Sequence, residues 1–167
     1  ISSVTSAPGN YKFNLGSDGL DESSVQLATI ASGYDLYRSK EDVDISIVLQ
    51  GRPIGGTTVS TDGVTVTNYL LANYLIDNLV DTADINGVVN PARRDCVVVI
   101  SPDKSLVLNN FGQEAASLVN WRNSVHDSSY AIMDTSYKYQ YDRYNDIYRW
   151  IPLNGDIGGI LARTDHT

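Results

Sequence analysis

The residues of this chain that could do covalent chemistry are few and poorly spaced for it. Cys96 is the single thiol, and it opens an apolar run that ends at Ile100. Apolar surroundings disfavour a thiolate, so we expect Cys96 to be buried and structural. A nucleophilic triad needs Ser or Cys, His and a carboxylate that meet in space, and the Gly-x-Ser-x-Gly nucleophile elbow is absent. We therefore assign no catalytic residue.

Metal-binding residues are equally sparse. His126 and His166 are the two histidines, and with one thiol they show no zinc-ligand spacing. We expect His126 at the surface. The acidic clusters at 18–22 and 41–44 lack the spacing of a calcium loop and are typical of solvated turns. The sequence predicts no metal site.

A glycine-rich segment could suggest a phosphate-binding loop. Gly51-Arg52-Pro53-Ile54-Gly55-Gly56 follows a predicted strand, but it lacks the Gly-Lys-Ser/Thr ending and the Gly-x-Gly-x-x-Gly pattern. We interpret residues 51–65 as a flexible connection and expect no nucleotide or other cofactor.

Aromatic residues gather near the C-terminal end, since six of the eleven tyrosines lie between residues 130 and 148. Two interpretations remain open. Alternating aromatic side chains could cover a sheet edge as part of the core, because period two needs one buried face. They could instead form a subunit interface, since Tyr, Trp and Arg are enriched in binding hot spots. The candidate interface residues are Arg143, Tyr144, Tyr148 and Arg149.

Three short apolar strands alternate with helices along the chain. The predicted strands are residues 45–49, 96–100 and 130–134, and the run at 96–100 is apolar on both faces, as in the centre of a covered sheet. Parallel strands need helical crossovers, so this order predicts an α/β fold: a three-layer domain with a mostly parallel central sheet.

The helices between and before these strands have their own signals. Ser23 or Ser24 could cap a first helix that stops at Gly33, and Asn110 with Gln113 resembles a capping box. A second helix is predicted from about 66 to 81. The core-facing stripes are Ala72, Leu75, Ile76 and Leu79 in that helix, and Ala115, Leu118 and Val119 in the next.

The last forty residues predict a hairpin and a helix. Residues 137–151, with a turn at 143–146, form an antiparallel hairpin that we place at the sheet edge. Asn154 is expected to cap a helix over 155–163, with Ile157, Ile160 and Leu161 towards the core. Gly158 and Gly159 weaken a helix, which indicates close backbone packing or a marginal helix end.

The domain organisation predicted from the sequence is simple. Residues 1–20 form a flexible lead-in with a short strand at 11–15, and residues 21–167 form a single α/β domain. The start at Ile1 suggests part of a longer protein. With 42% hydrophobic and 19% charged residues the composition is typical of a globular domain.

Charge and hydropathy exclude several function classes. A net charge of -8 and a pI near 4.5 disfavour general binding to nucleic acid. No apolar run approaches the roughly 20 residues of a membrane span, so membrane insertion is not expected. A single cysteine fits assembly in a reducing cytoplasm.

Residues 130–165 carry a long, ordered resemblance. An apolar strand ends in Asp134, a Tyr-Lys-x-x-Tyr-Asp-x-Tyr-Asn-Asp stretch begins at Tyr137, and Arg-Trp-Ile-Pro-Leu and Ala-Arg-Thr-Asp follow at 149–153 and 162–165. Segments 33–48 and 93–98 add weaker matches. The chain resembles the core domain of the contractile tail sheath proteins of T-even-like bacteriophages.

This resemblance implies a structural role and no enzymatic activity. Sheath subunits stack as rings around a tail tube and contract to drive the tube through the host envelope for genome delivery. The implied partners are other sheath copies, the tail tube protein, and baseplate and tail terminator proteins. The implied location is the virion, after assembly in the bacterial host cytoplasm. By itself the chain is expected to be a monomer or weak oligomer.

Two alternatives stay open at this point. One is a sheath subunit of a bacterial contractile injection system. The other is a small-ligand-binding α/β domain whose ligand lies at the strand ends, near 101–103 and Asp134. A pocket with convergent polar groups would favour ligand binding, and a flat or filled surface would favour the sheath.

Overall fold

A computed structural model describes residues 25–54, 58–61, 64–67, 70–81, 84–85, 88–89 and 93–165. Several predictions lie outside these residues: the lead-in with its strand at 11–15, and His166. The candidate caps Ser23 and Ser24 also lie outside them.

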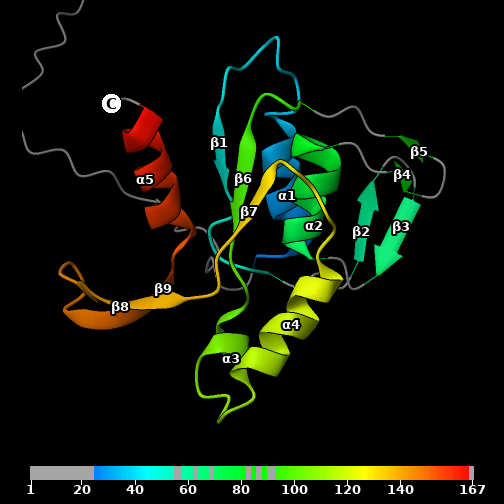
Figure 1. Ribbon diagram of the computed structural model, residues 1–167. Helices are drawn as coiled ribbons and strands as arrows, with labels where there is room; N and C mark the ends of the chain where they lie inside the picture. Colours follow the sequence, from blue (N-terminus) through cyan, green and yellow to red (C-terminus); the bar gives the residue numbers. More distant parts are fainter. Residues whose placement is uncertain are drawn as a thin grey trace, which may run out of the picture.

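A three-stranded parallel sheet forms the centre of the described structure (Figure 1). Its strands are β1 (Ile47–Leu49), β6 (Val97–Ile100) and β7 (Ala131–Met133), in the order β1-β6-β7. Val48 pairs with Val98, and Val98 pairs with Ala131. The parallel arrangement is confirmed, and the strand that is apolar on both faces is the central one.

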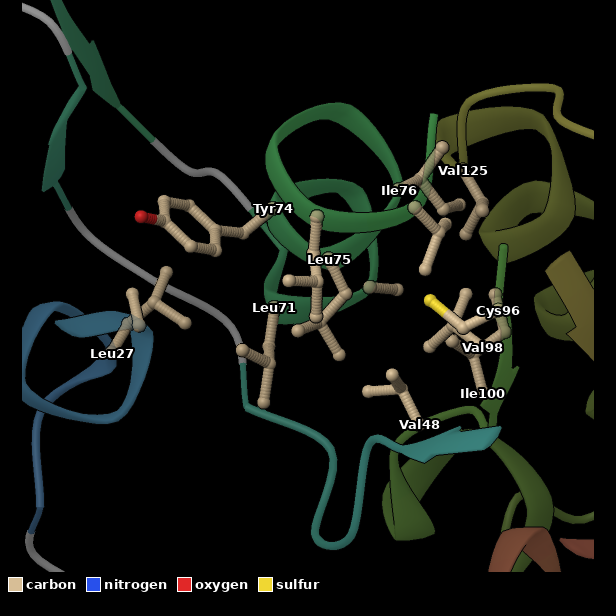
Figure 2. Close-up of a cluster of buried hydrophobic side chains, with 14 of the residues drawn as sticks. Leu27, Val48, Leu71, Tyr74, Leu75, Ile76, Cys96, Val98, Ile100 and Val125 are labelled. Atoms are coloured by element: carbon tan, nitrogen blue, oxygen red, sulfur yellow. The ribbon is translucent and has the colours of Figure 1, made fainter. Parts of the chain in front are cut away.

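Two helical segments cover one face of the sheet. They are α1 (Leu27–Asp35) and α2 (Leu71–Leu75), which runs on as the π-helix η2 (Ile76–Val80). All ten residues of α2 and η2 are buried, which is expected of a helix that is enclosed on every side. Figure 2 shows Leu71, Leu75 and Ile76 pointing towards Val48 and Val98 across the core. The predicted core stripe of this helix is confirmed.

The opposite side of β1 is covered by α5 (Asn154–Asp165), which stands apart from α1 and α2 across the sheet in Figure 1. A Cβ placed on Gly158 would lie 2.5 Å from Leu49 Cδ2, whereas Gly159 has open space around it. Gly158 therefore allows the close packing that the sequence indicated. Ile160 is exposed and does not face the core as predicted, because the buried side of α5 is centred on Gly158.

The start and end of α1 differ from the prediction. Its N-cap is Gln26, whose side chain makes no capping hydrogen bond, and the helix begins at Leu27. The helix passes through Gly33 and ends at Asp35. Gly33 is tolerated there because tertiary contacts hold the last turn: Tyr34 donates from its hydroxyl to the Leu49 carbonyl at 2.7 Å.

The next helical pair also departs from its predicted caps. α3 (Lys104–Val107) precedes α4 (Glu114–Ser124), whose N-cap Gln113 makes no side-chain capping bond. The Asn110 amide instead donates to Ser117 Oγ at 2.7 Å, so the predicted capping box is wrong. Val119 is exposed, and the buried side of α4 is set by Trp121.

Two small hairpins occupy connections between the larger elements, and the first lies mostly in residues 51–65, which we interpreted as a flexible connection. β2 (Thr58–Thr61) pairs with β3 (Val64–Thr67), and β4 (Asp84–Ile85) pairs with β5 (Val88–Val89). Residues 51–65 therefore include strand structure, and the helix predicted from 66 begins at Leu71. Alternating Val and Thr at 64–67 is a strand pattern, and it overrides helix propensity there.

The predicted tyrosine-rich hairpin is confirmed as β8 (Tyr137–Asp142) and β9 (Ile147–Pro152). We expected this hairpin at an edge of the central sheet. That placement is wrong, because β8 and β9 form a separate two-stranded sheet. In Figure 1 it projects away from the central sheet below α5.

Candidate interaction surface and strand-end cluster

Polar side chains meet where the parallel strands end. Ser101 follows β6 and donates a short hydrogen bond from its hydroxyl to the Asp134 carboxylate, which follows β7. The Asn154 amide donates to Ser101 Oγ at 2.9 Å and to the Gly51 carbonyl at 2.7 Å. Asn154 thus joins α5 to two strand ends and does not act as the predicted cap. Asp134, Ser101 and Asn154 are all buried.

Electrostatics support a structural role for this cluster. Burial raises the pKa of Asp134, and the hydrogen bonds from Ser101 and from the Ser136 backbone partly oppose that rise. The Ser101 backbone N–H donates to Gln50 Oε1 at 2.8 Å, so the strand-end groups are paired with one another. The Ser101–Asp134 cluster itself is filled by its own side chains, which gives it a structural role, whereas an open hollow lies beside it at Asp103.

Among the described residues no histidine lies beside Ser101, whose hydroxyl is bonded to the buried Asp134 carboxylate. His126 precedes β7 and therefore lies towards the opposite end of the parallel sheet. Its Nδ1 contacts Asp77 Oδ2 at 2.8 Å, and its backbone N–H donates to Asn73 Oδ1 at 2.9 Å. The His126 side chain is half-exposed, and its contacts with Asn73 and Asp77 hold it against α2 and η2. The prediction of a surface residue is therefore confirmed only in part.

Cys96 is buried in the hydrophobic core, as predicted. Figure 2 shows its sulfur among Ile76, Val98 and Val125. Burial raises the pKa of the Cys96 thiol, and the nearby Asp95 carboxylate adds to this effect. Within the described ranges no group of three or more His, Cys, Asp or Glu side chains could hold a metal ion.

The hairpin presents a ladder of aromatic rings to solvent. Tyr139 pairs with Trp150, and Tyr141 pairs with Tyr148, which places all four on one face. The ring centroids of Tyr139 and Tyr148 are 5.0 Å apart, and those of Tyr139 and Trp150 are 4.8 Å apart. All four side chains are exposed, so the interpretation of these aromatics as core is wrong. The hairpin bends away from the sheet, and nothing in the described chain covers this face.

The candidate interface residues are all near the hairpin tip but do not share one face. Tyr144 lies in the turn, 88% exposed, with the Arg143 guanidinium 5.5 Å from its ring centroid. Tyr148 belongs to the aromatic ladder. Arg149 lies on the reverse face and donates from Nε to Asp142 Oδ2 at 3.0 Å. The turn therefore presents Arg143 and Tyr144 together, while Tyr148 and Arg149 point to opposite sides.

The aromatic face continues into a hollow beside α3. This hollow measures about 520 Å³, and its wall combines Tyr137, Trp150 and prolines with Arg52 and Lys104. Both cations are exposed, and neither forms an ion pair with the described residues. The pKa of Tyr137 is raised by burial and by the Asp103 and Asp134 carboxylates, and Arg52 opposes that shift. We call this site the basic hollow.

A buried arginine fixes the opposite end of the sheet. Arg93 donates from Nη1 to the Tyr37 carbonyl and from Nη2 to the Val43 carbonyl, both at 2.7 Å. Its Nε donates to Asp95 Oδ1 at 2.9 Å, and this contact lowers the pKa of Asp95. The loop between α1 and β1 is therefore held at two points.

The sequence did not identify Arg52 and Lys104 as residues of one surface hollow, and it did not identify Arg93 as a buried structural residue. Arg52 was weighed as part of a phosphate loop, and no pattern linked it to Lys104, which lies on the segment after another strand. The available signal was topological, because the carboxyl ends of parallel neighbours share one edge of a sheet.

Known proteins with similar sequences supply the family. The tail sheath protein of Vibrio phage KVP40 is 32% identical over an alignment of 191 residues, which covers 97% of this chain and 28% of that protein. The tail sheath protein of Enterobacteria phage T4 is 30% identical over 161 residues, covering 90% of this chain and 22% of that protein. This chain belongs to the bacteriophage tail sheath protein family.

The most similar segment among these relatives is shorter. The tail sheath protein of Salmonella phage ViI is 47% identical over 73 residues, which covers 43% of this chain and 12% of that protein. This chain spans only about a quarter of the length of the KVP40 and T4 relatives. No family model matches it. Within the part of the chain that the structure describes, no helix has the length and hydropathy of a membrane span.

Proposed function

We propose that this chain is part of a structural subunit of a contractile phage tail sheath. In this role the subunit polymerises around the tail tube and contracts, which drives the tube through the host envelope for genome delivery. The observation that carries the proposal is the similarity to two tail sheath proteins over at least nine tenths of the chain. Coverage of about a quarter of each relative supports a longer, multidomain parent protein.

The proposed partners follow from the same role. They are other copies of the sheath protein, the tail tube protein, and baseplate and terminator proteins at the two tail ends. The proposed location is the virion, after assembly in the host cytoplasm. The three relatives named above are all phage proteins, which favours a phage sheath over a bacterial injection apparatus.

We propose a structural and not an enzymatic role. Its support is that Ser101 and Asp134 are buried and bonded within the fold, while His126 lies towards the other end of the sheet. We also propose that residues 21–167 form one three-layer domain. The contacts of α5 with β1, opposite the α2 and η2 face, support this arrangement.

The hairpin tip is the proposed contact site between subunits. Tyr144 and Arg143 present an exposed aromatic ring and an exposed cation together, and this combination is frequent at binding hot spots. Tyr148 adds the neighbouring aromatic face, and Arg149 the reverse face. Because Tyr144 makes few contacts within the chain, its replacement should leave folding intact.

Electron microscopy of the full-length protein tests the proposal. We expect tubular assemblies of sheath dimensions, and a protein that stays dispersed under all assembly conditions would refute the sheath function. The Tyr144→Ala variant should form fewer tubes than wild type. Phe111→Ala is the matched control, because Phe111 is 93% exposed on the segment between α3 and α4. An equal loss in both variants would contradict a specific role for the hairpin tip.

A further inference from the structure

Unpaired charges of opposite sign lie at opposite ends of the central sheet. Glu41 and Asp42 belong to the loop between α1 and β1, at the amino end of β1, and both are exposed. Arg52 and Lys104 follow β1 and β6, at the carboxyl end of the same sheet. None of these four side chains forms an ion pair with the described residues. The exposed Lys40 and Asp44 flank the acidic pair and Asp103 lies beside the basic pair, so the first end carries a small excess of negative charge and the second a small excess of positive charge.

The loop at the acidic end of the sheet is held in place by hydrogen bonds. We call residues 36–46 the acidic loop; it rises above the sheet in Figure 1. The two carbonyl bonds from Arg93, to Tyr37 and Val43, hold the loop on both sides of Glu41 and Asp42. A loop fixed in this way loses little conformational entropy when it binds.

Each end also offers apolar surface beside its charges. Leu36 is 76% exposed at the start of the acidic loop, and Tyr37 is exposed next to it. The basic hollow offers Trp150, Tyr137 and Pro53 beside Arg52. The exposed Leu36 beside the acidic pair could therefore fit the concave apolar wall of the basic hollow, beside Arg52. Such a match of shape and charge is what a protein contact requires.

We propose that the acidic loop of one copy of this chain docks in the basic hollow of a second copy. Glu41 and Asp42 face Arg52 and Lys104, and Leu36 enters the hollow against Trp150. The contact joins different surfaces on the two copies, so it is a head-to-tail contact. Repetition of such a contact can build an open filament of subunits. This proposal rests on the sheath function and identifies one contact through which copies stack along the sheet direction.

The expected strength of this contact is low. Exposed ion pairs contribute little, and a small patch is typical of transient association. Asp103 also lies in the hollow, although its carboxylate is occupied in capping α3 by accepting from Ser105 N at 2.9 Å. We therefore expect association of the isolated chain only at high concentration and low salt, because salt screens exposed charges.

Charge reversal with rescue tests the contact by sedimentation velocity on the purified chain. Wild type should self-associate at concentrations up to about 1 mM in low salt, with a dissociation constant that rises when salt is added. Arg52→Glu/Lys104→Glu should weaken association about tenfold or more, and Glu41→Lys/Asp42→Lys should do the same. The variant with all four changes should recover association, because the two ends again carry opposite charges.

Controls separate this contact from net charge and from misfolding. Arg122→Glu is the match for Arg52→Glu, since it makes the same change at another exposed arginine, on α4 and outside both surfaces, and it should leave association unchanged. Circular dichroism checks that each variant is folded. A wild-type chain that stays monomeric, reversal variants that associate normally, or a fourfold variant that fails to recover would each overturn the proposal.

The two proposals can fail separately. If the full-length protein and its charge-reversal variants all form tubes, the sheath function stands and this contact is wrong. If the full-length protein forms no tubes, the sheath function fails, and sedimentation of the isolated chain still decides whether the acidic loop binds the basic hollow.

Discussion

Two adjacent glycines in α5 allow a controlled test of how this helix packs on the sheet. A Cβ at Gly158 would lie 2.5 Å from Leu49 Cδ2, well inside the about 3.5–4.0 Å of a normal carbon contact. At Gly159 no atom lies within 4 Å of the added Cβ. Both residues are inside the same helix, so alanine should bring the same gain of about 1 kcal/mol in helix propensity at each.

The cost of the clash decides the difference between the two variants. Inserting a methyl group into a packed contact typically costs about 1–3 kcal/mol. Leu49 is 39% exposed and can turn its end towards solvent, which favours the lower limit, about 1 kcal/mol. We expect Gly159→Ala to raise the free energy of unfolding by about 1 kcal/mol and Gly158→Ala to leave it nearly unchanged. Leucine at each position should widen the difference, because its helix propensity is close to that of alanine.

Urea denaturation followed by circular dichroism measures these differences. In a Leu49→Ala background the clashing atom is gone, so Gly158→Ala should become stabilising by about 1 kcal/mol. The double-mutant cycle should therefore give a coupling of about 1 kcal/mol between Gly158 and Leu49. Equal stabilisation by alanine at Gly158 and Gly159 in the wild-type background would refute the packing of α5 described above.

Three further predictions concern the buried arginine, the strand-end cluster and the aromatic ladder. Arg93→Ala should lower the free energy of unfolding by about 1–3 kcal/mol in thermal or urea denaturation, because it leaves two loop carbonyls without their donor and removes the partner of the half-exposed Asp95. A loss below about 0.5 kcal/mol would contradict this. The raised pKa of Asp134 means that folding favours its protonated form, so its contribution to stability is full below the unfolded value of about 3.9 and is lost as pH rises. Asp134→Asn should abolish that loss, and parallel stability-against-pH curves for wild type and variant would disprove the assignment. Tyr148→Ala should destabilise the chain by about 1 kcal/mol through lost ring stacking, while Tyr144→Ala should change it by less than about 0.5 kcal/mol; equal effects in urea denaturation would contradict the ladder.

Elements with a strong periodic pattern were predictable from the sequence. The apolar run that begins at Cys96 gave the central strand, and the Ala72–Leu79 stripe gave the buried helix. Element ends were less predictable, because tertiary contacts replaced the expected caps. Tyr34 holds α1 beyond Gly33, and Asn110 binds Ser117 in place of a capping role.

The candidate site was predictable only in part. Alternation at 137–151 identified the hairpin and the pairing of its aromatic residues. It could not decide whether that face is covered, because burial of a strand face depends on which element packs against it. The same limit applies to Arg52 and Lys104, which are far apart in sequence and meet through the parallel pairing of β1 and β6.

By itself the sequence determined the α/β class, the buried thiol, the hairpin and the sheath family, since each rests on local pattern or on direct similarity of residues. The tertiary structure alone decided that Ser101, Asp134 and Asn154 are bonded to one another, that the aromatic ladder is exposed, and that acidic and basic residues lie at opposite ends of the sheet. The physical reason is that hydrogen-bond partners, burial and surface charge depend on which distant segments meet. That information is fixed by the packing of the strands and helices and is absent from the spacing of residues along the chain.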